Sequence, residues 1–354
     1  MKITTNFCGG NGKVLSVDTE NKIVRFAQEL RDTEGGWFYW AFCVEGAAGE
    51  TVTFDMAPQS YIGYFGAAFS HDLVHWDWTY SANSARTAFT YTFGTDETRV
   101  YFAHDMLYHP SQFALFCELH GLIPKTLCED RNGTPIPYVT VGSGDKIVLL
   151  TARHHCCEAT GDYIMEGILD EFTRNPSEEY TLIAIPFIDA DGVVRGDHGK
   201  NRKPHDHNRD YIEGIYPGVR AVRSIMGQGH VESVFDLHSP WHLGGRNDKV
   251  FVVRNYPAKM EEYRRFGKCF MAEITESAMQ YDTKNDIDPG VEWNELKTQA
   301  LTCGTYCGTF PGVDLSFSLE TTYFGEEGNV VSQEKLVETG RCFWRGYLSY
   351  RREN

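Results

Sequence analysis

The spacing of apolar residues divides the chain into two parts. Up to about residue 105, apolar and aromatic residues alternate with polar ones or gather in short runs, which clusters of Gly, Asn and Asp separate. This pattern predicts short β-strands, most clearly at 37–44, 51–54, 87–93 and 99–102. We therefore expect residues 1–105 to form an all-β sandwich or jelly-roll domain.

The segment 61–78 of this first part is rich in Gly and aromatic residues. Its rings suit two roles, since they either fill the core of a small β-domain or form an aromatic face that binds sugars. We favour the first role, because aromatic side chains bury a large apolar area in a small core.

After residue 105 the apolar spacing becomes that of alternating strands and helices. Strands are predicted at 146–151, 181–187, 231–237, 249–253 and 314–319. Helices are predicted at 113–119, 163–172, 217–226, 258–279 and 332–350, the last with a Ser cap. This order indicates an α/β domain over 106–354, with a mixed, largely parallel central sheet flanked by helices.

Composition narrows the classes of function. The net charge of -16 argues against a nucleic-acid partner, because neutralising phosphates requires a clustered cationic face. No apolar run approaches the length of a membrane span, and the first residues lack the apolar stretch of a secretory signal. We therefore expect a cytoplasmic protein with no membrane partner, in which the 10 cysteines are reduced.

Three predicted strands end at residues that can bind a metal or move a proton. His155 and Glu158 follow the strand at 146–151, His238 follows the one at 231–237, and Glu320 follows the one at 314–319. Ligand sites in open α/β sheets lie at the carboxyl ends of strands. Two histidines and a glutamate that leave a fourth position open form the pattern of a catalytic zinc site.

Residues near this predicted site offer other possible ligands and further roles. Cys156 and Cys157 are also potential ligands, and spacing alone does not exclude them. Asn208 and Arg209 lie in a loop rich in basic residues. An arginine guanidinium can form two parallel hydrogen bonds with one carboxylate. Beside a zinc site, Glu320 is suited to act as the general base on a water molecule.

The order of these motifs resembles that of the funnelin-type zinc carboxypeptidases. The motifs are His155…Glu158, Asp206-His207-Asn208-Arg209, the distant His238 and the late Glu320. The chain looks most similar to the cytosolic carboxypeptidases and their bacterial relatives, which join an N-terminal β-sandwich to the catalytic domain. The resemblance implies a sandwich over 1–105 and a zinc carboxypeptidase-like catalytic domain over 106–354.

The resemblance also implies a role for each motif residue. His155, Glu158 and His238 would bind one zinc ion, and Asp206 would orient a ligand histidine. Asn208 and Arg209 would hold the terminal carboxylate of the substrate, and Arg202 would polarise the scissile carbonyl. Glu320 would take a proton from the attacking water and return it to the leaving amine.

Three features depart from the family pattern or are not placed by it. Cys156-Cys157 stands where the family usually has Pro-Gly, which changes the turn between the two metal ligands. Relatives that remove glutamate carry a basic residue before the late Glu, whereas 309–313 here is uncharged, so we do not expect glutamate specificity. Tyr281 and Tyr306 are both candidates for the active-site tyrosine of the family.

The sequence thus predicts a zinc-dependent metallocarboxypeptidase that hydrolyses the C-terminal bond of a peptide with a free carboxylate. An amidase or deacylase acting on a small N-acyl amino acid, an amino-acid amide or a peptidoglycan peptide would use the same residues. A third interpretation is a non-catalytic protein whose sandwich binds a partner.

Overall fold

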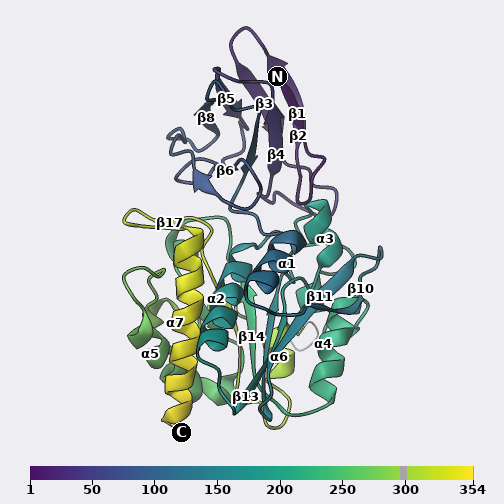
Figure 1. The fold of residues 1–354 in the computed structure, drawn as a ribbon, viewed down its shortest axis with the longest axis vertical. Coiled ribbons are helices and arrows are strands. Elements are labelled where there is room, and N and C mark those ends of the chain that lie inside the picture. Colours follow the sequence, from purple (N-terminus) through teal and green to yellow (C-terminus); the bar gives the residue numbers. More distant parts are fainter. Residues whose placement is uncertain (296–300, 354) are drawn as a thin grey trace.

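The computed structural model describes residues 1–295 and 301–353, and its N-terminal part is a β-sandwich (Figure 1). One sheet has the order β1 (Lys2–Thr4), β4 (Ala41–Glu45), β9 (Arg99–Ala103), β6 (Ala68–Ser70), β7 (Asp77–Trp78). The other has the order β2 (Lys13–Asp18), β3 (Ile23–Ala27), β5 (Thr51–Asp55), β8 (Ala88–Thr92). Neighbouring strands are antiparallel except β3 and β5, which are parallel.

Aromatic rings fill the space between these two sheets. Phe42 and Phe102 of one sheet contact Phe54 of the other, with ring centroids 5.3 and 5.1 Å away. In the segment 61–78, Trp76 and Trp78 are buried, and the Trp78 indole donates to the carbonyl of Val331. Burial of these two rings supports their predicted role in the core rather than in a sugar-binding face.

The predicted run at 37–44 is only partly a strand. β4 begins at Ala41, and the residues before it extend toward the second part of the molecule. There the Trp37 ring packs edge to face on Trp241, at 5.0 Å. Tertiary packing rather than strand pairing therefore sets the conformation of this aromatic segment.

A seven-stranded mixed sheet forms the centre of the second part. Its order is β10 (Lys125–Glu129), β11 (Pro135–Gly142), β13 (Tyr180–Ile185), β12 (Lys146–Ala152), β14 (Val231–His238), β16 (Leu315–Glu320), β15 (Phe251–Arg254). The four strands from β13 to β16 are parallel, and the outer ones pair antiparallel. A small hairpin joins β17 (Gly325–Glu326) and β18 (Asn329–Val330). The predicted α/β class, mixed and with a parallel centre, is confirmed.

Helices cover this sheet on both sides (Figure 1). They are α1 (Pro110–Leu119), α2 (Thr160–Arg174), α3 (Ala190–Arg195), α4 (Pro217–Gly227), α5 (Met260–Glu273), α6 (Cys303–Cys307) and α7 (Gln333–Arg352). The view shows α2, α5 and α7 on one side of the strands and α4 on the other. None of the helices in the described ranges is long and apolar enough to span a membrane.

The helix predicted at 258–279 is shorter in the structure. α5 ends at Glu273, because Ile274 adopts an extended backbone and the chain then turns toward α7. The amide of Met279 donates to Thr339 Oγ1 of α7 at 2.8 Å. A side-chain partner on another helix thus replaces helical bonds that the apolar spacing alone predicts.

Two glycines let α2 and α7 cross closely. A Cβ atom on Gly167 would lie 1.9 Å from the carbonyl oxygen of Val337, and one on Gly340 would lie 2.1 Å from that of Ile164. Any larger residue would separate the helices.

The strand register brings the ends of three neighbouring strands together. His238 of β14 pairs with Glu320 of β16, and Leu237 pairs with Ala152 at the end of β12. These ends lie at the edge of the sheet that faces the sandwich, whose Trp37 lines the same cavity (Figure 1). The expected convergence of His155, His238 and Glu320 is therefore a consequence of the sheet topology.

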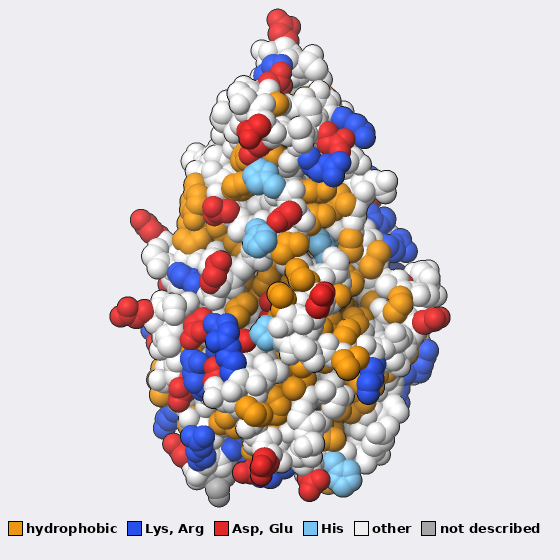
Figure 2. Space-filling model, in the orientation of Figure 1, with side chains coloured by type: hydrophobic (Ala, Val, Ile, Leu, Met, Phe, Trp, Pro, Cys, Tyr) orange, Lys and Arg blue, Asp and Glu red, His pale blue; other side chains and the backbone are white. Residues whose placement is uncertain are grey.

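Charged side chains are mixed on the face of the molecule seen in Figure 2. Lys and Arg lie beside Asp and Glu, without one continuous basic patch on this face. This arrangement agrees with the acidic net charge of -16.

Candidate metal centre

His155, Glu158 and His238 bring three metal-binding groups together. His155 Nδ1 lies 2.9 Å from Glu158 Oε1, and His238 Nδ1 lies 2.7 Å from Glu158 Oε2. One donor atom from each residue falls within 4.8 Å of the others. Two imidazole nitrogens and a carboxylate oxygen are a donor set that zinc prefers, so these residues fit a single metal ion.

A buried arginine shapes the turn that carries two of these groups. Arg153 has a φ of 60°, and its guanidinium contacts Asp162 at 2.6 Å on α2. The same group donates to the carbonyls of Cys156 at 2.6 Å and Tyr108 at 2.7 Å. Arg153 thereby fixes the turn in which Cys156-Cys157 stands in place of Pro-Gly.

Carboxylates lie behind both candidate histidine ligands. Asp236 Oδ2 is 2.6 Å from His238 Nε2, and Asp206 Oδ1 is 3.7 Å from His155 Nε2. Burial raises the pKa of Asp236, but His154 and His238 outweigh it and hold this pKa well below its ordinary value. A hydrogen-bonded carboxylate in this position fixes the ring orientation and tautomer of a metal-binding histidine, so Asp236 leaves Nδ1 of His238 to face Glu158.

His154 belongs to the hydrogen-bond network rather than to the centre itself. Its donor atoms group with those of Asp236 and His238 within 4.8 Å. However, His154 Nδ1 lies 2.8 Å from Asp236 Oδ1, and Nε2 lies 2.7 Å from the Tyr211 hydroxyl. Both ring nitrogens are therefore already hydrogen bonded.

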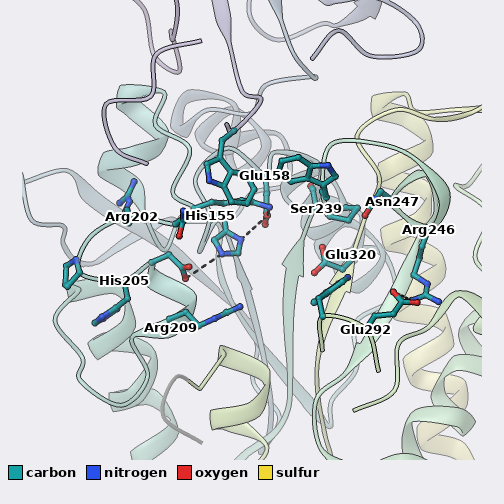
Figure 3. A pocket seen from close by; sticks show the side chains of 18 residues that line it. His155, Glu158, Arg202, His205, Arg209, Ser239, Arg246, Asn247, Glu292 and Glu320 are labelled. Atoms are coloured by element: carbon teal, nitrogen blue, oxygen red, sulfur yellow. Dashed lines mark hydrogen bonds and ion pairs between the residues drawn. The ribbon is translucent and has the colours of Figure 1, made fainter. Parts of the chain in front are cut away.

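Glu320 lies beside the three-residue cluster with one oxygen available. The side chain is 7% exposed, and its Oε2 has no hydrogen-bond partner among the described residues. In Figure 3 its carboxylate points toward the imidazole of His155. Burial, reinforced by Glu158, raises the pKa of Glu320 to about 7 against the opposing effects of His238 and Lys200. A carboxyl with this pKa is suited to accept and return a proton near neutral pH.

Lys200 is a buried cation at the same centre. Its Nζ lies 2.5 Å from Glu158 Oε1, and the residue is 8% exposed. The ammonium also lies 5.2 Å from the ring centroid of Trp37, a residue of the sandwich part. Burial lowers the pKa of Lys200, but Glu158 outweighs this effect and raises it overall, so the side chain is charged.

The sandwich positions the loop that carries Lys200. The Asp32 carboxylate accepts hydrogen bonds from the backbone amides of His198 and Gly199, at 3.1 and 2.9 Å. Thr33 Oγ1 donates to the carbonyl of Lys200 at 2.6 Å. The placement of this cation therefore depends on contacts between the two parts of the chain.

An open cavity of about 1010 Å³ surrounds the centre (Figure 3). His155, Glu158 and Glu320 lie in its wall, and Trp37, Trp241 and Trp293 add aromatic surface. Farther from the cluster, Arg246 forms an ion pair with Glu292 at 2.7 Å. The cavity is large enough to admit the end of a peptide as well as a single amino acid.

Comparisons of sequence find relatives among known proteins. No family model matches the chain. Cytosolic carboxypeptidase 2 of Xenopus tropicalis is 26% identical over 195 residues, which are 46% of this chain and 20% of that protein. An uncharacterised protein of Zymomonas mobilis is 25% identical over 259 residues, or 67% of each chain. The match thus spans about a fifth of the length of the frog protein.

Comparisons of structure agree along nearly the whole chain. A metallo-carboxypeptidase from Burkholderia cenocepacia has a TM-score of 0.81 at 21% identity, with 99% of each chain covered. A metallo-carboxypeptidase from Pseudomonas aeruginosa has a TM-score of 0.80 at 20% identity, with 100% of each chain covered. The chain therefore has the fold of these metallo-carboxypeptidases, and its sequence is similar to cytosolic carboxypeptidases. The cluster of His155, Glu158 and His238 offers donors that could hold a metal ion.

The two residues predicted to hold a substrate carboxylate, Asn208 and Arg209, lie in different surroundings. The Asn208 side chain lies beside His238, with Nδ2 3.1 Å from Nε2, and its Oδ1 accepts from the Cys303 amide at 2.8 Å. Arg209 donates to the carbonyl of Asn208 at 3.0 Å, and it forms no ion pair in the described part of the chain. Arg209 also lines the cavity, so its charge is available to a ligand.

Arg202 has a different place from the one expected. It lines the cavity, but its guanidinium forms ion pairs with Asp32 and Asp189, each at 2.9 Å. Figure 3 shows this side chain directed away from Glu158 and Glu320. Lys200, two residues earlier, is the cation that reaches Glu158. Arg202 therefore ties its loop to Asp32 and Asp189, and Lys200 approaches the candidate metal centre.

The two thiols of the turn, Cys156 and Cys157, do not join the cluster of His155, Glu158 and His238. Cys156 Sγ donates to the Asp197 carbonyl at 3.0 Å, and Cys157 Sγ lies 4.0 Å from the Tyr323 hydroxyl. Burial raises the pKa of Cys157 to about 12, so this thiol stays protonated at neutral pH. Both thiols are thus packed in the turn, and His155 and Glu158 remain the predicted ligands.

Neither candidate for the family's active-site tyrosine lines the cavity as described. The Tyr281 hydroxyl is 2.9 Å from Asp286 Oδ2, and the Tyr306 ring packs against Tyr211 at 5.2 Å.

The sequence motifs gave no role to Asp236. A signal for it exists, because residues two apart on a strand share a face, which puts Asp236 beside His238.

Proposed function

We propose that the protein is a zinc-dependent metallocarboxypeptidase that hydrolyses the C-terminal peptide bond of its substrate. The observation that supports this best is one cavity with three complementary parts. These are the donor cluster of His155, Glu158 and His238, the unpartnered oxygen of Glu320 and the available charge of Arg209. The similarity to carboxypeptidases in sequence and in fold supports the same reaction class.

Arg209 is proposed to anchor the substrate by its terminal carboxylate. A guanidinium can give a carboxylate two parallel hydrogen bonds, which fixes orientation as well as position. The P. aeruginosa metallo-carboxypeptidase was crystallised with a substituted succinic acid, itself a carboxylate compound. Asn208, held by the Cys303 amide, would support Arg209, whose guanidinium donates to the Asn208 carbonyl.

Glu320 is proposed to move the protons of hydrolysis. Zinc held by His155, Glu158 and His238 would supply a Lewis acid that polarises the scissile carbonyl and makes water more acidic. The Glu320 carboxylate accepts a proton from the attacking water and then gives it to the amine of the departing residue. Its position at the end of β16, opposite His238, places it on the same edge as the ligands.

Lys200 is proposed to stabilise the negative charge that develops on the carbonyl oxygen. Preorganised charge in a buried site stabilises such an oxyanion strongly, because no solvent has to reorganise. The Nζ of Lys200 lies at Glu158, whereas the guanidinium of Arg202 is engaged by Asp32 and Asp189. Arg202 then acts indirectly, by holding the loop in place.

Replacing Glu320 by Gln tests the reaction while keeping the shape of the site. Turnover of a peptide with a free C-terminus should fall by about 10²–10⁴-fold, with the metal content unchanged. Glu292→Gln, a second carboxylate of the same cavity, is the matched control and should keep most of the activity. An E320Q enzyme with wild-type turnover would refute the assigned base.

Peptides with free and amidated C-termini distinguish this function from an amidase or deacylase. A carboxypeptidase should cleave the free form and leave the amidated form nearly intact, because only the free form pairs with Arg209. Equal cleavage of both forms would reject the exopeptidase assignment and favour the other hydrolase.

A further inference from the structure

A second cavity, of about 600 Å³, lies on the far side of the Arg202 loop. Arg202 lines both cavities, so its side chain separates this space from the candidate metal centre. The turn at 31–34 of the sandwich forms one wall. The turn between β10 and β11, the start of α3 and the segment around His207 form the others.

Asp130, Asp189 and His207 converge in this second cavity. One donor atom from each lies within 4.8 Å of the others, and the residues are 5%, 1% and 1% exposed. Bonds of about 2.0–2.2 Å to one ion place donor atoms roughly 3–4.4 Å apart, a spacing that small side-chain rotations reach here. The three residues come from separate parts of the chain, so their convergence is a property of the fold.

His207 shows that these groups have room for a further partner. Neither of its ring nitrogens has a hydrogen-bond partner in the residues described, although the side chain is almost completely buried. The ring is held flat on Tyr216, at 3.7 Å between centroids, and its Nδ1 faces Asp189 Oδ2 at 3.7 Å. Buried polar atoms are normally satisfied, so an imidazole left with both nitrogens free needs an explanation.

The charge in the cluster is negative and incompletely balanced. Arg202 pairs with Asp189, but neither Asp130 nor Asp191 takes part in an ion pair within 1–295 and 301–353. Burial, and then Asp189, raise the pKa of Asp130 to about 6. Burial lowers the pKa of His207 to about 4, which leaves the neutral imidazole that binds metals.

We propose that Asp130, Asp189 and His207 form a second metal site, which takes a divalent transition-metal cation. One imidazole together with carboxylates suits Zn²⁺ or Mn²⁺, whereas Ca²⁺ prefers a site made of oxygen ligands alone. Asp191 Oδ1, which is buried without a partner, lies at the same cavity and offers a further oxygen. Arg202 remains on Asp189, as the hydrogen-bonding group that commonly supports a metal-binding carboxylate.

A cation there would stabilise the neighbouring active centre. It would join the β10–β11 turn to α3 and to the segment that begins at His207. That segment carries Asn208 and Arg209, and Asp206 precedes it. The site is therefore structural, and its existence does not depend on the proposed peptidase activity.

Zinc counting in variants tests this site separately from the first one. The whole protein is saturated with Zn²⁺, dialysed and measured by mass spectrometry for bound metal per chain. Wild type should hold two equivalents, and a His155→Gln/Glu158→Gln double variant should hold one. Adding His207→Phe, which keeps a ring on Tyr216, should remove the remaining equivalent.

Control variants make each outcome decisive. Glu34→Gln, which changes a carboxylate at the rim of the second cavity, should leave the remaining equivalent in the double variant. Asp130→Asn replaces His207→Phe if circular dichroism shows that the latter fails to fold. A double variant that holds no metal, or one whose metal survives both His207→Phe and Asp130→Asn, would overturn the proposal.

Discussion

Asp236 Oδ2 lies 2.6 Å from His238 Nε2, and the imidazole therefore turns its Nδ1 toward Glu158. Replacing Asp236 by Asn removes the charge that fixes this tautomer, and such changes typically weaken metal binding by about 10–100-fold. Competition with a chelating dye measures the change at the His155 centre. Asp206→Asn is the matched comparison, because its carboxylate lies farther from a ligand ring, at 3.7 Å, and should matter less. Unchanged zinc affinity in D236N would contradict this role.

The proposal that Lys200 stabilises the oxyanion can be tested by comparing variants of Lys200 and Arg202. Lys200→Met should lower kcat by about 10²–10³-fold with a smaller change in KM, because the charge acts in the transition state. Lys200→Arg should restore part of the loss. Arg202→Met should mainly lower thermal stability, since it breaks the ion pairs with Asp32 and Asp189. The assignment fails if R202M loses kcat at unchanged stability while K200M stays active.

The anchor for the substrate carboxylate gives a prediction about binding. A hydrogen bond to a charged group contributes about 1.5–3 kcal/mol, so Arg209→Met should raise KM for a free C-terminal peptide by roughly 10–150-fold. The same variant should bind an amidated peptide as well as wild type does. Arg246→Met, in the same cavity but paired with Glu292, is the control. A KM that rises equally for both peptides would point to general damage instead.

The convergence of the candidate metal-binding residues could be predicted because strand ends are easy to recognise. His155, His238 and Glu320 each follow an apolar run, and parallel pairing of β12, β14 and β16 brings such ends together. The position of Asp236 beside His238 could also have been predicted, because side chains two residues apart on a strand share a face. These inferences need only local patterns and one rule of topology.

The identity of the nearby cation could not be predicted in this way. Lys200 and Arg202 share one loop, and their spacing does not decide which side chain reaches Glu158. Asp32 decides it, by binding the amides of 198 and 199 and the guanidinium of Arg202. Asp32 is more than 160 residues away in sequence, so only the assembled fold reveals the contact. The early end of α5 has the same cause, a partner on a distant helix.

A buried histidine predicts how stability depends on pH. His109 is 3% exposed, and burial, reinforced by Arg153, lowers its pKa to about 3 in the folded protein. The unfolded chain has an ordinary histidine pKa of about 6.5, so it binds a proton first as the pH falls. The contribution of neutral His109 to the free energy of unfolding is therefore complete above pH 6.5, and it is lost progressively as the pH falls toward 3.

The expected loss can be measured with a neutral replacement at the same position. At pH 5, about 1.5 units below the unfolded value, the protonation of His109 in the unfolded chain should cost ~2 kcal/mol. In urea unfolding at pH 7 and pH 5, His109→Asn should lose that much less stability than wild type. His230→Asn, at an exposed residue with a φ of 71° that Asn tolerates, is the control and should follow wild type. Parallel losses in wild type and H109N would show that His109 does not contribute to this acid sensitivity.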